Sequence, residues 1–298
     1  MTTIIVTIMI VLLLLGFPMM IPLITAAFVG FFMSFGGLGQ METLIQQMMR
    51  GISPTSLIAV PMFILAADIM TRGQSASRLI DMVMTFVGHV KGGLAVSTAV
   101  SCTLFGAVSG STQATVVAVG SPLRPRMLKA GYKDSFTLAL IINSSDIAFL
   151  IPPSIGMIIY GVISQTSIAE LFIAGIGPGV MILLMFSAYS VMYAIFNKVP
   201  TEPKSSWKAR AVAVQKALWP LGFPVIIVGG IYGGVFSPTE AAAACVLYAI
   251  LLEFVVFRSL KLPDIYTIAK STGLITAVVF ILVAAGNGFS WIISFAQI

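Results

Sequence analysis

The long apolar runs of this sequence decide what the chain can fold into. Residues 3–33 contain no charged side chain, and this run exceeds the roughly 20 residues that a membrane-spanning helix needs. Of the 298 residues, 58% are hydrophobic and 9% are charged, whereas a soluble domain carries about 25% charged residues. A water-facing surface of normal extent cannot be made from this composition. The sequence therefore predicts an all-α polytopic membrane protein lying in a lipid bilayer.

The distribution of charge predicts orientation and excludes one class of partner. The chain carries a net charge of +6, but its Lys and Arg residues lie in short segments between apolar runs. This is the pattern of the positive-inside rule rather than of a surface that binds nucleic acid. Placing residues 124–133 in the cytoplasm puts every other Lys and Arg there except Arg50. We expect an inner-membrane protein with a periplasmic N-terminus, whose first apolar run is retained. Cys102 and Cys245 lie in apolar stretches, and we expect buried free thiols.

An internal repeat organises the expected spans. SLIAVPMFILAADIM at 56–70 aligns without gaps with GLITAVVFILVAAGN at 273–287, and nearly the same offset aligns Pro22 with Pro238. Such repeats mark many secondary transporters. The first repeat, residues 1–197, is expected to hold spans at about 2–16, 18–34, 55–71 and 169–197, a hairpin at 92–120 and a broken span at 136–164. A cytoplasmic linker (198–216) precedes the second repeat (217–298), which has spans at about 217–233, 240–257 and 271–290. Five crossings would invert this second copy, which we expect to be incomplete at residue 298.

The hairpin at 92–120 is the first candidate site. Seven glycine and hydroxyl or amide residues gather at its middle: Gly106, Ser109, Gly110, Ser111, Thr112, Gln113 and Thr115. Unwound backbone is tolerated within a membrane where it is buried in protein or lines a cavity. Neutral oxygens suit a hard monovalent cation such as sodium. The alternative is a helix-packing face of small residues, which the number of such residues disfavours.

The segment at 143–154 is the second candidate site. Pro152 and Pro153 lack a backbone N–H and disfavour a continuous helix. The break frees carbonyl groups near Leu150 and Ile151 for a cation, and the helix that begins after it presents a positive N-terminal end to an anion. A kinked helix without a site is the alternative.

Two aspartates lie near these segments. A carboxylate at mid-membrane is costly, so Asp146 is expected to face a partner or water. Asp146 could supply negative charge for sodium or a proton. It could equally lie at the aqueous mouth of the span or pair with a loop lysine. Asp68 is expected to pair with Arg72, four residues away on one helix.

Several stretches resemble the large membrane subunit of tripartite ATP-independent periplasmic (TRAP) transporters. They are VPMFILAADIMTRG, GGLAVSTAVSCTLFGAVSGSTQAT, MLKAGYKDS, LIPPSIGMIIYG, SIAELFIAGIGPG and FSPTEAAA, in family order. The resemblance implies a sodium-driven elevator transporter with an inverted repeat, a re-entrant hairpin and discontinuous helices. It also implies a small four-helix membrane subunit and a periplasmic substrate-binding protein as partners. Asn143-Ser-Ser-Asp146 departs from the family, which more often has small apolar and glycine residues there.

The expected function follows from the residues and the resemblance together. We expect import of an organic anion, a C4-dicarboxylate or a sialic acid, with sodium as the coupling ion and no organic cofactor or catalytic residue. The expected ion-binding residues are Ser109, Gly110, Ser111, Thr112, Leu150 and Ile151. The expected substrate-binding residues are Gln113, Thr115, Asn143, Ser144, Asp146, Pro152, Pro153 and Ser154.

Two alternatives stay open at this point. One is a one-component sodium-coupled di- or tricarboxylate carrier that needs no binding protein. The more remote one is an intramembrane aspartyl protease using Asp68 and Asp146, although neither lies in a Gly-x-Gly-Asp motif.

Overall fold

The protein is all-helical over the residues described by a computed structural model, which are 1–35, 37 and 41–297. Among these residues, five helical stretches are long and apolar enough to cross a membrane: Thr55–Arg72, Ile168–Phe196, Trp207–Tyr232, Pro238–Val256 and Leu262–Phe295. This agrees with the predicted polytopic α-helical class. The helices form two compact units, Met1–Leu57 with Gly273–Ile298, and Ile58–Thr272. These units divide the chain differently from the expected repeats, and the inverted repeat stays a prediction.

In the described residues, the first unit contains three α-helices, the C-terminal part of a fourth and the first three residues of a 3₁₀ segment at 55–58. The α-helices are α1 (Thr2–Leu14), α2 (Met20–Phe35), α3 (Met41–Ile52) and α14 (Leu262–Phe295). Helix α1 packs on α2 after a turn at Gly16, whose φ of +81° glycine adopts readily. Phe31, Leu44 and Ile292 are fully buried together in the core of this unit. The amphipathic helix α3 was not expected, because its five polar or charged side chains interrupt the apolar pattern.

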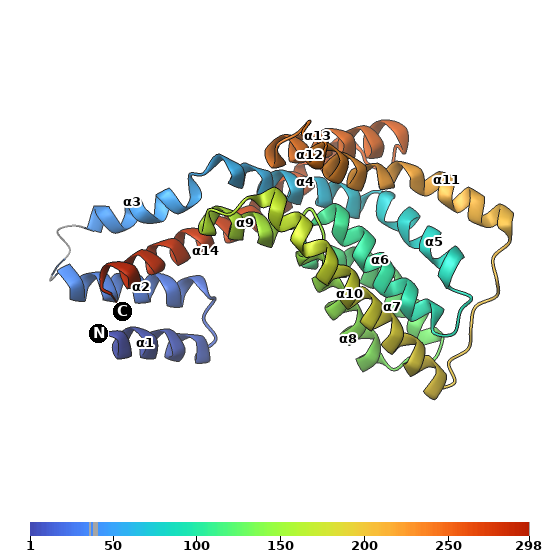
Figure 1. Cartoon of the computed structure of the whole chain (residues 1–298), viewed down its shortest axis with the longest axis horizontal. Helices are drawn as coiled ribbons and strands as arrows, with labels where there is room; N and C mark the ends of the chain where they lie inside the picture. The colour runs from blue at the N-terminus through green and yellow to red at the C-terminus, as the bar shows by residue number, and fades with distance from the viewer. Residues whose placement is uncertain (36, 38–40, 298) are drawn as a thin grey trace. The chain divides into compact units, whose positions relative to one another are not determined.

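The second unit holds the remaining helices (Figure 1). They are η1 (Thr55–Ile58), of which only Ile58 falls in this unit, α4 (Ala59–Arg72), α5 (Ser75–Val87), α6 (Gly93–Ser109), α7 (Thr112–Lys129), α8 (Asp134–Ser145), η2 (Asp146–Phe149), α9 (Ile155–Ser164), α10 (Ile168–Phe196), α11 (Trp207–Pro224), η3 (Val225–Gly229), α12 (Gly230–Tyr232), α13 (Pro238–Ile250) and η4 (Leu251–Val256). The expected linker differs from the structure at its end: residues 201–206 have no regular secondary structure, but α11 already begins at Trp207 after its capping residue Ser206.

Helix α6 is the central element of the second unit. It packs against α5, α7, α8 and α10 (Figure 1). Nearly all of its side chains are buried, including Phe105 and the hydroxyl residues Ser97, Thr98 and Ser101. An apolar helix that is buried on all sides, rather than along one stripe, belongs to the interior of a bundle. The first arm of the predicted hairpin therefore lies inside the unit.

A buried carboxylate joins α13 to the start of α5. Glu253 is fully buried in the π-helical segment η4 and accepts hydrogen bonds from the backbone N–H groups of Gln74 and Ser75, both at 2.9 Å. The hydroxyl of Ser259 donates to the same carboxylate. An anion at the N-terminus of a helix satisfies unpaired N–H groups and complements the helix dipole. This contact holds the N-terminus of α5 against the segment that contains Glu253.

The segment that breaks the predicted span at 136–164 rests on two glycines of α10. The Leu150 carbonyl oxygen faces Gly175, where an added Cβ would lie 2.1 Å from it. The Ile151 side chain lies against Gly179, one helical turn further along. Small residues four apart let a neighbouring backbone approach closely. Helix α10 therefore positions the break by leaving room for it.

We expect Gly175→Ala to lower the melting temperature of the detergent-solubilised protein by several degrees. Its Cβ would meet the Leu150 carbonyl group, and overpacking of this kind costs about 1–3 kcal/mol. Gly177→Ala is the matched control, because no atom lies within 4 Å of its added Cβ and alanine favours a helix over glycine by about 1 kcal/mol. Equal melting temperatures for the two variants would contradict this packing.

Candidate functional site

The hairpin tip forms because the residue that follows α6 adopts a left-handed backbone conformation. Helix α6 ends at Ser109, and Gly110 follows with a φ of +61°, a conformation in which a side chain is strained. Ser111 then caps α7 by accepting a hydrogen bond from the Ala114 N–H group at 3.4 Å. The sequence Ser-Gly-Ser therefore encodes a C-cap followed directly by an N-cap.

The break in the predicted span at 136–164 is built in a similar way. Helix α8 ends at Ser145 and continues through the short 3₁₀ segment η2 to Pro152 and Pro153. Ser154 caps α9: its hydroxyl donates to the Phe149 carbonyl group at 2.7 Å and accepts from the Met157 N–H group at 3.2 Å. The serine thus satisfies backbone groups on both sides of the break.

The hairpin tip and the break contact each other directly. The Ile155 N–H group donates to the Gly110 carbonyl oxygen at 3.3 Å. A Cβ added to Gly110 would lie 2.5 Å from the Pro153 carbonyl oxygen. Earlier in α6, Gly106 lies against Ala148 of η2, so that its added Cβ would come within 2.8 Å of the Ala148 methyl group. The two candidate segments therefore form one continuous site.

The hydroxyl groups of the tip are tied into its backbone, with one exception. The Thr115 hydroxyl donates to the Ser111 carbonyl oxygen at 2.8 Å, and the Ser109 and Thr115 hydroxyls lie 3.2 Å apart. Ser111 also contacts the Gln113 amide oxygen at 3.2 Å. The buried Thr112 Oγ1 atom has no hydrogen-bond partner among the described residues. Thr112 is therefore the tip hydroxyl that remains available for a further contact.

The electrostatics of the site follow from the directions of its helices. Helices α7 and α9 both begin where the tip meets the break, and each N-terminus carries about half a positive elementary charge. Helix α6 ends at the same place, and its last carbonyl groups carry the opposite partial charge. Such an arrangement can hold an anionic group at the two N-termini and a cation at the carbonyl end.

The structure places the other sequence-predicted residues as follows. Pro152, Pro153, Ser154 and Ser144 are buried, and the Ser144 hydroxyl has no hydrogen-bond partner in the described part of the chain. Gln113, Asn143 and Asp146 are exposed, and the Asn143 amide donates to the Ala139 carbonyl group at 2.7 Å. The Leu150 carbonyl group, expected to face a cation at the break, instead faces α10. Ligand roles for all of these residues remain predictions.

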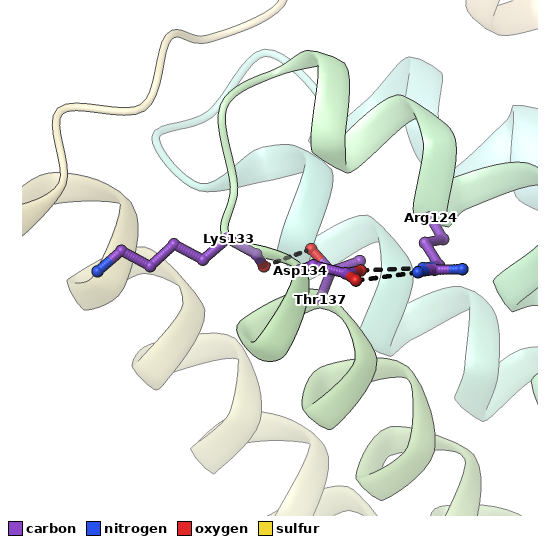
Figure 2. Close-up of polar contacts among 4 residues, drawn as sticks. All are labelled: Arg124, Lys133, Asp134 and Thr137. Atoms are coloured by element: carbon purple, nitrogen blue, oxygen red, sulfur yellow. Dashed lines mark hydrogen bonds and ion pairs between the residues drawn. The ribbon is translucent and has the colours of Figure 1, made fainter.

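Charged residues outside the tip and break form two ion pairs among the described residues. The predicted pair within one helix is confirmed, since the Arg72 and Asp68 side chains lie 3.0 Å apart. Figure 2 shows the second pair, in which Arg124 of α7 donates two hydrogen bonds to Asp134, at 3.0 and 2.9 Å. This guanidinium lowers the pKa of the Asp134 carboxyl group through hydrogen bonding and charge. The pair joins α7 to the start of α8.

The predicted free thiols are also confirmed, because Cys102 and Cys245 are both unpaired and buried.

Comparison with known proteins identifies the family. Residues 6–298 match the family model described as "Tripartite ATP-independent periplasmic transporter, DctM component". The chain belongs to this family. It is therefore a TRAP permease component in the membrane and belongs to a family of transporters rather than enzymes.

Named relatives of this TRAP permease transport different substrates. The chain is 84% identical over 298 residues to the ectoine TRAP transporter large permease protein TeaC of Halomonas elongata, covering 100% of this chain and 70% of the relative. It is 76% identical over 290 residues to the ectoine/5-hydroxyectoine TRAP transporter large permease protein UehC of Ruegeria pomeroyi, covering 97% and 68%. The C4-dicarboxylate TRAP transporter large permease protein DctM of Pseudomonas aeruginosa is 38% identical over 243 residues, covering 82% and 57%.

Sequence analysis missed the residues that hold the two halves of this TRAP permease site together. These are Ala148, which contacts Gly106 of the predicted hairpin, and the two glycines of α10 that receive the break. Their signal was present as Gly-x-x-x-Gly spacing at 175–179. The spacing shows that a backbone approaches closely, but it does not show which segment approaches.

We expect Gly110→Ala to reduce transport at least tenfold. Its Cβ would collide with the Pro153 carbonyl group and push the tip away from the break. Gly131→Ala is the matched control, because Gly131 also has a positive φ (+92°) but no atom within 4 Å of an added Cβ. Both variants carry the conformational strain, and only Gly110→Ala carries the collision. Equal loss in the two variants, measured as uptake by the reconstituted transporter, would argue against a function for the contact.

Proposed function

We propose that this TRAP permease imports ectoine or a closely related cyclic amidine carboxylate, coupled to sodium. The observation that carries this proposal is the 84% identity, over the whole chain, to an ectoine permease. A second ectoine permease at 76% identity supports it, whereas the C4-dicarboxylate relative stands at 38%. Ectoine replaces the C4-dicarboxylate or sialic acid expected from the sequence.

The chemistry of ectoine fits the site. The molecule is a zwitterion with one carboxylate and one amidinium, whose positive charge is shared between two ring nitrogens. The N-termini of α7 and α9 can bind the carboxylate through backbone N–H groups without a Lys or Arg. A C4-dicarboxylate would bring two negative charges to the same place. The neutral polar lining of the tip is better matched to a substrate with no net charge.

Sodium is the proposed coupling ion, and the hairpin tip is its proposed place. The carbonyl end of α6 and the hydroxyls of Ser109, Ser111 and Thr112 supply neutral oxygen ligands. Hard cations prefer oxygen ligands. The buried Thr112 hydroxyl supports this role most directly, because an unsatisfied buried hydroxyl is costly unless something binds to it.

The wider assembly is inferred from the family. A tripartite system combines the large permease with a small four-helix membrane subunit and a periplasmic substrate-binding protein. This membership separates the chain from a one-component carrier and from an aspartyl protease. The proposed mechanism is an elevator movement of the hairpin-containing part between the two faces of the inner membrane. The inverted repeat, the re-entrant path of 92–120 and the periplasmic N-terminus belong to this proposal.

The substrate is tested by uptake into proteoliposomes that hold the complete membrane complex, with its binding protein outside. We expect ectoine uptake to rise at least tenfold when an inward sodium gradient replaces a choline gradient. Succinate and sialic acid should give no sodium-dependent uptake above liposomes without protein. Uptake of succinate but not ectoine would overturn the proposed substrate, and ectoine uptake indifferent to sodium would overturn the coupling.

The sodium site is tested by Ser109→Ala, Ser111→Ala and Thr112→Ala. We expect the sodium concentration for half-maximal uptake to rise about tenfold in Thr112→Ala, since loss of one ligand of about 1.4 kcal/mol changes an equilibrium tenfold. Smaller rises are expected for the two serines, whose hydroxyls already bond to the tip. Ser187→Ala serves as control, because within the described part of the chain its hydroxyl bonds only to the Leu183 carbonyl group of its own helix. An unchanged sodium dependence in all three variants would remove sodium from the tip.

A further inference from the structure

The two segments that form the site contain a single charged side chain. Residues 92–120 include no Asp, Glu, Lys or Arg, and residues 136–164 include only Asp146. Neither of the ion pairs formed by the described residues involves Asp146. The fixed formal charge of this part of the site is therefore negative, although the helix N-termini favour an anion.

Asp146 lies on the short element that leads into the break. It begins η2, in which Ile147 and Ala148 are buried and Ala148 packs on Gly106 of α6. Asp146 and Phe149 of the same element are exposed, Phe149 to 44%. Residues three apart in a 3₁₀ helix lie above one another. The carboxylate and the phenyl ring are therefore presented on one face of η2.

This face adjoins the start of α9. The Phe149 ring lies against Gly156 in the first turn of α9, where an added Cβ would come within 3.0 Å of the ring. The Phe149 carbonyl group is held by the Ser154 cap at 2.7 Å. A carboxylate, an aromatic ring and a helix N-terminus thus follow one another along η2 and the break.

That order of groups matches a planar cation joined to a carboxylate. A delocalised cation of this kind binds a carboxylate through two parallel N–H groups and stacks on an aromatic face. The carboxylate of the same molecule can then lie at the positive N-terminal end of α9, where the N–H group of Gly156 is bonded neither to Gly110 nor to Ser154. A dianion would gain nothing from Asp146 and would be repelled by it.

We propose that Asp146 is a specificity-determining residue that binds the cationic amidinium of the substrate, with Phe149 stacking on it. This inference rests on the proposed function, since it presupposes a zwitterionic substrate. It assigns the departure of Asn143-Ser-Ser-Asp146 from the family pattern to substrate choice. Sodium or proton binding by Asp146 is the rival role.

Binding to the membrane complex alone tests the proposal, because the binding protein would add its own specificity. The measurement is the rise in melting temperature with ligand concentration, in detergent and saturating sodium. The probes are ectoine and cyclohexanecarboxylate, which keeps a six-membered ring and a carboxylate but lacks the cation. We expect Asp146→Asn to weaken ectoine binding about 10- to 100-fold, the usual range for a hydrogen bond to a charged group. Cyclohexanecarboxylate should bind Asp146→Asn as well as, or better than, the unaltered protein.

Three further variants make the result specific. Asp146→Glu keeps the charge and should retain ectoine binding better than Asp146→Asn. Phe149→Leu keeps the apolar volume but removes the ring, and it should weaken ectoine more than cyclohexanecarboxylate. Asp134→Asn removes the exposed carboxylate of the Arg124 pair and should leave both ligands unaffected.

Each remaining outcome overturns a different statement. Equal loss of both ligands in Asp146→Asn would show a general structural role and refute the inference. A shifted sodium midpoint with unchanged ectoine binding would assign Asp146 to the ion instead. Ectoine transport by the unaltered protein together with unaltered ectoine binding in Asp146→Asn would refute this inference and leave the proposed function standing. Failure of the unaltered complex to bind ectoine would overturn both.

Discussion

The requirement that buried backbone groups find hydrogen-bond partners shapes this site. A helix that stops inside an apolar environment leaves N–H and C=O groups unpaired, which water cannot satisfy there. Here two interrupted helices meet, and a hydrogen bond between them pairs a backbone group of one with a backbone group of the other. The Ile155 N–H group bonds to the Gly110 carbonyl oxygen, while Ser111 and Ser154 cap the helices that restart. The close approach depends on residues without bulky side chains, Gly106 and Gly110 on one side and Ala148 on the other. Backbone groups at these helix ends that are left over after these bonds can bind a ligand.

The same geometry explains how a site with little formal charge can act on charged molecules. Partial charges at helix ends are fixed by the backbone and need no ionisable side chain, whose burial would be costly. Two N-termini and one C-terminal end meet at the tip and the break, so anionic and cationic groups can be bound side by side. In a site with so few charged side chains, a single carboxylate has a large effect on the local electrostatic potential. Asp146 makes the local formal charge negative, and under the role proposed for it a substrate must complement that charge or be repelled by it.

Much of the site could be predicted from the sequence, for local reasons. Ser-Gly-Ser and Pro-Pro-Ser act through the conformations of their own residues, so the interruptions at 110 and 152–154 follow from short-range rules. The pairing of Asp68 with Arg72 follows from helical periodicity. The orientation of the Leu150 carbonyl group toward α10 could not be predicted. It depends on which segment of the chain packs against the glycines at 175 and 179. Helices α3 and α5 were missed because polar residues interrupt their apolar pattern. Ectoine could not be predicted either, since no motif in the chain indicates that the substrate contains an amidine.

The physical roles of these residues determine which parts of the site tolerate substitution. Residues that allow the tip and the break to meet are constrained by space and by backbone conformation, and any side chain larger than a hydrogen atom at Gly110 disturbs them. The exposed face of η2 is less constrained, because Ala148 makes the contact with Gly106 of α6, whereas Asp146 is exposed. Phe149 is constrained on one side, where its ring lies against Gly156. If the proposed roles hold, the helix ends would bind the carboxylate of every substrate, and the side chain at position 146 would select the rest of the molecule. Relatives named for C4-dicarboxylates and for ectoine, within one family, are what such an arrangement allows.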